Sequence, residues 1–356
     1  MASYGDVLAV LKEFRNDLER KVHHDINERA SPGLQAFASR ARGGLSAFST
    51  ASTNVHASGA GIRVRNGFPV PNEFVIKVYV FDKFPEQRGD ALVTTFDGID
   101  VDVEQLPVQL ALHAAPAAKV PSNRKRHRPI PAGVSIAPIN ESYVGTLGIF
   151  LSRRGPGAEQ IYILSNNHVL ADTNRLPIGT PIGQPGPEKS PINPEDVFAS
   201  LSSFVPLLFP THPSSTPTNR FDAAIAIVSD PSLITTGKIL GINKYVPTIG
   251  TAVPGMRVIK SGRTTGVTHG IVTATRVNGV QVNYGTQASP FIATFNDTIE
   301  VIGLDDQTFS KPGDSGAIIL EESTGHPVAL LFAGDGHTTT ACDIGGVCQQ
   351  FSAQPV

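Results

Sequence analysis

Cysteine is nearly absent from this sequence of 356 residues. The two cysteines, Cys342 and Cys348, both lie close to the C-terminus, and two are far too few for the disulfide framework of a secreted protein. We therefore expect both to be reduced thiols. Because no cluster of His and Cys completes a four-ligand set around this pair, the sequence predicts no metal and no cofactor.

Net charge is almost absent too, with a formal value of -2. It gives no electrostatic reason to expect nucleic acid or an anionic membrane as a partner. No apolar run approaches the length of a membrane span, and the N-terminal residues MASYGDVLAV lack the basic start and long apolar core of a secretory signal. These absences predict a cytoplasmic protein with no nucleic-acid or membrane partner.

The composition that remains is typical of a globular protein, with 40% hydrophobic and 17% charged residues. Gly 34 and Pro 28 imply many turns and favour β structure over helical bundles. The length favours one large unit with a smaller accessory region. We divide the chain into an N-terminal helix with a flexible connector (1–58), a small α+β accessory domain (59–111), a basic Pro/Ala linker (112–132) and a large β domain (133–356).

The N-terminal segment carries a helical pattern of apolar residues at three- to four-residue spacing: Val7, Leu11, Phe14, Leu18 and Val22. This face either docks on its own chain or forms a homo-oligomer contact, and both alternatives stay open. Residues 30–58 are rich in Ser, Ala and Gly, as a flexible connector would be.

The accessory region has strand patterns at residues 61–65, 73–81 and 98–104. The linker that follows contains a basic cluster: Arg124, Lys125, Arg126, His127 and Arg128. We expect this linker to be an extended, solvated and mobile tether, with a processing site or a nucleic-acid contact as the alternatives.

After residue 133 short strand patterns alternate with turn residues. The first series covers residues 145–151, 160–165, 177–184, 197–208 and 222–229. The second covers residues 257–259, 264–276, 279–284, 297–301, 315–321 and 327–333. We predict a mainly β fold of two tandem six-stranded antiparallel barrels. Within it, GRTTGVTHG at 262–270 is interpreted as a hairpin, because no Lys-Ser pair and helix follow it as in a phosphate-binding loop.

The segment FSKPGDSGAIIL at residues 309–320 places Ser315 on a tight turn that leads into an apolar strand. Gly313 allows a backbone conformation closed to other residues, so that the N–H groups of Gly313 and Ser315 can converge on the oxygen of an attacked carbonyl. The pattern predicts a nucleophilic serine with an oxyanion hole.

A serine hydroxyl needs a base within hydrogen-bond reach, and that base needs a partner to orient it. His168, in YILSNNHVLAD, follows an apolar strand and has the most suitable context of the histidines. Asp222 opens the apolar run FDAAIAIVSD, where a buried carboxylate would be stabilised by a histidine N–H group. The order His168, Asp222, Ser315 matches the double barrel, and differs from the orders found in subtilisin and the α/β-hydrolases.

Through SNNHVLA, DAAIA and GDSG the sequence resembles the trypsin-like, chymotrypsin-fold serine proteases from residue 133 onward. It is more closely similar to the intracellular trypsin-like peptidases of bacteria and the plant narrow-leaf proteins, through FDGIDVDV, RPIPAGVSI, KSGRTTGVTHG and ALLFAG. The resemblance implies that Ser315 is the nucleophile, His168 the general base and acid, and Asp222 its orienting partner, with Gly313 and Ser315 as oxyanion donors.

The same resemblance implies a substrate-binding set: Phe309, Leu331, Phe332, Ala333 and Gly334. Residues 331–334 would form an edge strand that pairs with the substrate backbone. Phe309 stands where trypsin has the acidic residue that selects Lys or Arg, so an uncharged or apolar side chain is favoured before the scissile bond. The alternative is an acidic pocket supplied by Asp305, Asp306 or Asp335. Since no activating N-terminus is evident, Asp314 needs another donor, and we expect activity in the uncleaved chain or control by the N-terminal region.

The function predicted from these residues is serine endopeptidase activity on protein or peptide substrates. The alternative is a peptide-binding or scaffold module on a protease fold whose hydrolysis is vestigial, and a simple esterase is a third hypothesis, since the same triad hydrolyses esters.

Overall fold

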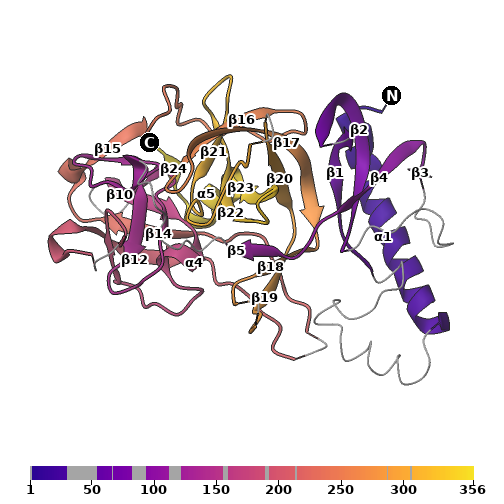
Figure 1. Ribbon diagram of the computed structural model, residues 1–356, viewed down its shortest axis with the longest axis horizontal. Coiled ribbons are helices and arrows are strands. Elements are labelled where there is room, and N and C mark those ends of the chain that lie inside the picture. The colour runs from indigo at the N-terminus through magenta and orange to yellow at the C-terminus, as the bar shows by residue number, and fades with distance from the viewer. Residues whose placement is uncertain are drawn as a thin grey trace.

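The computed structural model describes residues 2–29, 54–65, 67–81, 94–111, 122–154, 159–188, 192–212, 215–286, 288–304 and 307–356. The chain is mainly β, and two curved sheets lie side by side with the N-terminal helix and its strands at one end (Figure 1). Among the described residues no helix is long and apolar enough to cross a membrane.

The C-terminal sheet contains a closed antiparallel barrel, built from strands with these bounds: β16 (Arg257–Gly262), β17 (Gly266–Asn278), β20 (Thr298–Gly303), β21 (Ile318–Glu321), β22 (Pro327–Gly334) and β23 (Thr338–Asp343). Their pairing runs β16-β17-β20-β23-β22-β21 and returns to β16. Apolar side chains such as Val258, Val272 and Leu331 fill its interior. This confirms the second predicted barrel and the hairpin at residues 262–270.

The N-terminal sheet has eight strands in the order β24-β9-β10-β14-β12-β11-β7-β8. Their bounds are β7 (Ser135–Pro138), β8 (Gly145–Thr146), β9 (Phe150–Arg154), β10 (Glu159–Ser165), β11 (Pro181–Gly183), β12 (Val197–Phe204), β14 (Ala224–Val228) and β24 (Gln354–Pro355). The strand ladder stays open. Its two ends are linked by the irregular chain between β8 and β9, where the N–H groups of Leu147 and Gly148 donate to the carbonyls of Val134 and Leu164, each at 2.9 Å.

The mainly β class with two tandem antiparallel barrels is therefore confirmed, with the difference that the first is a half-barrel. Shorter elements complete the fold: β6 (Ile130–Ala132), β13 (Thr218–Asn219), β15 (Ile234–Ile239), β18 (Val280–Asn283), β19 (Ile292–Phe295), and the helices α4 (Asn167–Leu170) and α5 (Ile344–Phe351). Single-turn helices cover Ser122–Arg124, Pro194–Asp196 and Pro231–Leu233.

The N-terminal region packs on the C-terminal barrel. Its elements are α1 (Tyr4–Arg29), β1 (Val55–Arg65), β2 (Phe68–Val80), β3 (Thr95–Phe96), β4 (Ile99–Gln105) and β5 (Gln109–Ala111). β1 pairs antiparallel with β17, with Ser58 opposite Asn278 and Gly61 opposite Ala274. The accessory strands therefore extend the barrel sheet, as Figure 1 shows between β1 and β17.

The predicted N-terminal helix is confirmed, and its apolar face docks on its own chain. Val7, Leu11 and Phe14 are buried in one cluster with residues of the accessory strands such as Ile76 and Val78. The homo-oligomer contact stays an untested prediction. Of the predicted connector, residues 30–53 lie outside the described residues, and residues from Val55 onward belong to β1.

The basic linker differs from the prediction of a solvated, mobile tether. The Arg124 side chain is only 1% exposed and forms an ion pair with Glu188, and Arg126 and Arg128 both pair with Asp196. These carboxylates lie far along the sequence, so the pattern of the linker alone gave no sign of them. Residues 112–121 of the linker lie outside the described residues.

The cysteines agree with the prediction of reduced thiols, because Cys342 and Cys348 are both free and buried.

Candidate active site

The sequence-predicted base and its orienting partner meet where two neighbouring strands end. β10 pairs antiparallel with β14, with Ser165 opposite Ala224. His168 lies in α4 directly after β10, and Asp222 lies just before β14. The two side chains bond through His168 Nδ1 and Asp222 Oδ2 at 2.5 Å, and the His168 backbone N–H donates to Asp222 Oδ1 at 3.2 Å.

Tyr284, directly after β18, is a member of this site that the sequence analysis missed. Its hydroxyl donates to Asp222 Oδ2 at 2.8 Å, and its ring meets the His168 ring edge-on at 5.7 Å. Burial and the neighbouring Asp222 carboxylate raise the pKa of Tyr284 well above its usual value, so the hydroxyl stays protonated. Nothing in the surrounding VQVNYG distinguishes this tyrosine from a core residue, because its contact with Asp222 spans 62 positions of sequence.

Ser315 lies on the predicted turn, which the N-terminal sheet holds in place. Gly313 has φ +97°, a conformation that side chains other than that of glycine rarely adopt. Thr146 of β8 donates from its N–H to the Ser315 carbonyl at 2.8 Å and from its hydroxyl to the Gly313 carbonyl at 2.9 Å. The Ser315 hydroxyl donates to the Phe332 carbonyl at 3.4 Å. The predicted hydrogen bond between Ser315 and His168 stays a prediction, as do the oxyanion roles of Gly313 and Ser315.

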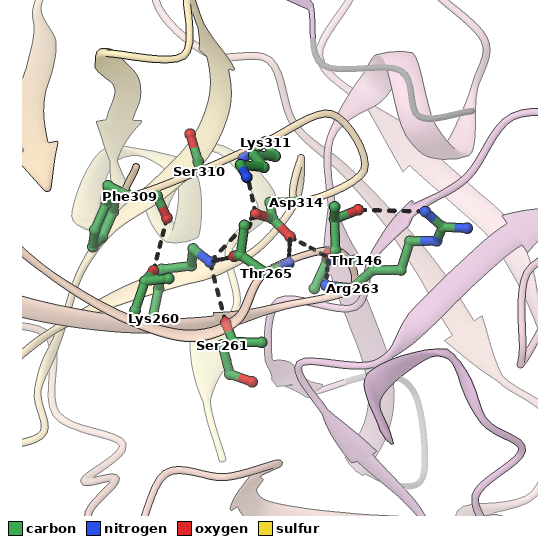
Figure 2. A network of polar contacts seen from close by, with 12 residues as sticks. Thr146, Lys260, Ser261, Arg263, Thr265, Phe309, Ser310, Lys311 and Asp314 are labelled. Carbon is green, nitrogen blue, oxygen red and sulfur yellow. Dashed lines mark hydrogen bonds and ion pairs between the residues drawn. The ribbon is translucent and has the colours of Figure 1, made fainter. Parts of the chain in front are cut away.

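Asp314, which needs a donor if no cut N-terminus supplies one, has several inside the chain (Figure 2). Lys260 Nζ lies 3.3 Å from Asp314 Oδ2, and both side chains are fully buried. The Thr265 hydroxyl also accepts a short bond from Lys260 and donates to Asp314 Oδ2 at 2.7 Å. Backbone N–H groups of Thr264, Thr265 and Lys311 complete the set at 2.8, 3.2 and 3.0 Å.

The approach of β16 to this carboxylate requires a residue without a side chain. A Cβ atom on Gly262 would lie 2.5 Å from Asp314 Oδ1. Burial lowers the pKa of Lys260, while the Asp314 carboxylate acts in the opposite direction and favours the ammonium form. The turn that carries Ser315 is thus fixed by contacts with the hairpin at residues 262–270.

The predicted substrate-binding residues fall into different surroundings. Phe309 and Leu331 are buried in the interior of the closed barrel, and Phe332 is buried in the larger cluster shared by the two sheets. Ala333 and Gly334 end β22. Whether these residues contact substrate stays a prediction.

The expectation that residues 331–334 form an edge strand is wrong for its last two residues. β5 pairs antiparallel with β22, with Ala333 opposite Ala111 and Gly334 opposite Leu110. The sequence did not reveal this partner, because β5 has three residues and pairs with a strand more than 200 positions away.

All three predicted catalytic residues are closed to solvent in this conformation. His168, Asp222 and Ser315 are each 0% exposed. A cleft of about 710 Å³ lies elsewhere, between the β1–β2 hairpin and the segment leading into β16, and its lining includes none of the three. Among the described residues no group of three or more His, Cys, Asp or Glu side chains is arranged to hold a metal ion.

Comparison with known proteins gives one family match and several structural neighbours. The profile of the Nal1 C-terminal domain matches residues 222–342, about a third of the chain. A glutamic acid specific serine protease that uses a histidine triad in substrate binding is 19% identical, with 63% of this chain and 99% of that chain covered and a TM-score of 0.42. No curated protein sequence matches the chain.

Two further solved structures are similar at the same level. A protease from Nocardiopsis is 18% identical, with 64% of this chain and 98% of that chain covered and a TM-score of 0.43. Protease A from Thermobifida fusca is 17% identical with the same coverage and a TM-score of 0.43. The closed barrel and the half-barrel beside it are defined by the strand pairing of this chain alone.

Proposed function

We propose that this chain is a serine endopeptidase that hydrolyses peptide bonds through an acyl-enzyme intermediate. The observation that carries the proposal is the buried pair of His168 and Asp222, bonded at 2.5 Å at the ends of two adjacent strands. A histidine oriented by a buried carboxylate, in one site with a serine on a glycine turn, is the arrangement that activates a hydroxyl nucleophile.

In the proposed reaction Ser315 Oγ attacks the substrate carbonyl carbon and passes its proton to His168 Nε2. The N–H groups of Gly313 and Ser315 stabilise the oxyanion that forms. The carbon–nitrogen bond then breaks, and His168 gives the proton to the leaving amine. A water molecule hydrolyses the ester on Ser315 by the same steps, with His168 as the base.

Asp222 serves this reaction by holding the Nδ1–H of His168 and by stabilising the imidazolium. The Tyr284 hydroxyl is a positioning group for that carboxylate, because it occupies a second acceptor site on Asp222 Oδ2. Asp314 and Lys260 fix the nucleophile turn from inside the chain. This internal pair supports activity without a newly cut N-terminus.

For the side chain before the scissile bond we propose an uncharged or apolar group. Phe309 occupies the position where trypsin carries its acidic residue, and the Phe309 ring is fully buried in the apolar barrel interior. We also propose that the enzyme acts in the cytoplasm, a reducing compartment in which free thiols such as Cys342 and Cys348 persist.

The alternative of a vestigial peptide-binding module does not account for the buried pair of Asp222 and His168. Burying a carboxylate and an imidazole costs free energy, and apolar side chains in their place would fold at least as well if no reaction depended on the pair. The present arrangement therefore favours the enzyme.

The test is covalent labelling of Ser315 in the full chain. Prolonged incubation with a serine-directed fluorophosphonate should add one adduct, which peptide mapping by mass spectrometry should locate on Ser315. Ser315→Ala should stay unmodified, and His168→Ala should react at least about 100-fold more slowly, the usual size of general-base catalysis. A wild-type chain that stays unlabelled, or one labelled equally well after His168→Ala, would contradict the proposal.

A further inference from the structure

β5 lies between two strands of the C-terminal sheet and belongs to neither hairpin beside it. On one side it pairs antiparallel with β22, and on the other it pairs parallel with β18, with Gln109 opposite Val282 and Leu110 opposite Asn283. Its side chains alternate as in a strand: Gln109 is 0% exposed, Leu110 51% and Ala111 7%.

The direction of β5 leads toward the nucleophile. Leu110 lies opposite Gly334 and Ala111 lies opposite Ala333, so the strand advances along β22 toward Phe332. The Phe332 carbonyl is the group that accepts the Ser315 hydroxyl. An extended peptide that added a strand to this end of β22 would need the backbone groups that β5 now uses.

We propose that β5 is a resident pseudosubstrate, occupying the edge of β22 on which a peptide substrate lies, so that catalysis requires its displacement. The inference rests on the proposed function and adds to it a form of regulation within the chain. The complete burial of His168 and Ser315 agrees with it, since no peptide reaches either residue in this conformation.

The contacts of β5 are compatible with a strand that leaves. The Gln109 Nε2 group donates to Asp335 Oδ2 and to the Pro107 carbonyl, each at 3.1 Å. The Gln109 Oε1 atom, however, is buried with no hydrogen-bond partner in the described part of the chain, which lowers the stability of the bound strand. A competing ligand of the same chemistry is an uncharged extended peptide with a small side chain at the position of Ala111.

The experiment measures binding of such a peptide without requiring hydrolysis. In full-length protein carrying Ser315→Ala, the probe is a fluorescein-labelled, C-terminally amidated peptide of sequence PVQLA, which copies residues 107–111. Ala111→Asp places a charge at the enclosed position of β5 and should release the strand. The matched control is Ala252→Asp, which places the same charge at a similarly enclosed alanine, 5% exposed, ahead of β16.

Fluorescence anisotropy should give a Kd at least tenfold lower after Ala111→Asp than in the parent, while Ala252→Asp should leave it unchanged. Gln109→Glu, which replaces the donor to Asp335 by a second carboxylate, is the second variant and should shift the Kd in the same direction. Circular dichroism confirms that each variant is folded. Equal Kd values in the parent and both β5 variants, or no binding in any of them, would overturn the inference.

A second readout separates this inference from the proposed function. In chains that keep Ser315, Ala111→Asp should raise the rate of fluorophosphonate labelling at least tenfold. Tighter peptide binding without any labelling would refute the endopeptidase and retain the strand displacement. If the parent is labelled as fast as Ala111→Asp and peptide binding does not change, the strand displacement is refuted and the endopeptidase is retained.

Discussion

The carboxylates of Asp222 and Asp314 are both fully buried, and each is held by a different kind of partner. Asp222 faces a histidine and a tyrosine hydroxyl, and its Oδ2 atom bonds to both side chains. Asp314 faces Lys260 and backbone N–H groups, which fix a turn. One buried acid therefore orients a histidine of the candidate site, and the other fixes the turn that carries Ser315.

Replacing Tyr284 with phenylalanine tests the positioning role at Asp222. Loss of a hydrogen bond to a charged group costs about 1.5–3 kcal/mol, so kcat should fall by about tenfold or more. The rate of fluorophosphonate labelling of Ser315 should fall with it, because a carboxylate held by one donor fewer orients His168 less well.

Tyr162→Phe provides the matched comparison, since it removes a hydroxyl that donates to Gln160 instead. It should leave both kcat and the labelling rate in place. An unchanged labelling rate in Tyr284→Phe would mean that the hydroxyl only supports packing.

Lys260→Met tests whether the nucleophile turn depends on its internal cation. Removing one partner of a buried ion pair costs about 3–5 kcal/mol, so the free energy of unfolding in urea should fall by that amount. Labelling of Ser315 should slow with it, because Asp314 would no longer hold the turn.

Lys77→Met offers a control of similar cost, since Lys77 is also fully buried and pairs with Glu104 at 2.7 Å and Glu300 at 3.4 Å. It should destabilise the chain without slowing the labelling of what remains folded. If both variants slow labelling equally, the Lys260 contact has no specific role at the site.

At this scale the sequence identified residues that carry a local motif. His168 and Asp222 stand beside apolar strands, and strand pairing brought them together as predicted. Tyr284 and Lys260 carry no such sign, because each acts on a residue more than 50 positions away. The Lys260 contact exists only once the C-terminal sheet has folded, and the Tyr284 contact only once the two sheets meet.

At the scale of elements, the N-terminal strands act as parts of the C-terminal sheet. The periodicity of apolar residues predicted α1, because the buried face of a helix is visible in the sequence as apolar residues at three- to four-residue spacing. The same reasoning could not assign β1 to β17 or β5 to β22, because strand pairing is non-local and three residues carry no pattern. The error about the free edge of β22 has this cause.

His56 on β1 provides a test of how tightly the accessory strands are joined to the barrel. Its ring stacks on Phe81 and its nitrogens face the carbonyls of Leu106 and Gly279. Burial lowers the pKa of His56 to about 4, despite these two carbonyls. Because the unfolded chain has the ordinary value of about 6.5, folding favours the neutral ring, and the stability present above that pH is lost as the pH falls toward 4.

The expected size of this effect is at most about 3 kcal/mol across that window. Urea unfolding of wild type and His56→Gln between pH 7 and pH 4 isolates it, since all other groups titrate in both proteins. Wild type should lose stability relative to the variant as the pH falls. Parallel curves would show that the ring is solvated in the folded protein.

At the scale of the whole molecule, the candidate active site lies where the two sheets meet. The N-terminal sheet supplies His168 and Asp222, and the C-terminal sheet supplies Ser315 and Tyr284. Thr146 joins the two by bonding the nucleophile turn. The tandem barrels were predictable from the order of motifs and the spacing of turns, whereas the open ladder of the first was not, because its ends are linked by an irregular segment.

The most direct test of the proposed catalytic unit is the set of new peptide termini produced in a denatured proteome. Wild-type chain should generate termini that share a preference before the cleaved bond for uncharged or apolar side chains, and Ser315→Ala should generate none of them. The same termini in both digests, or no new termini with wild type, would contradict the account.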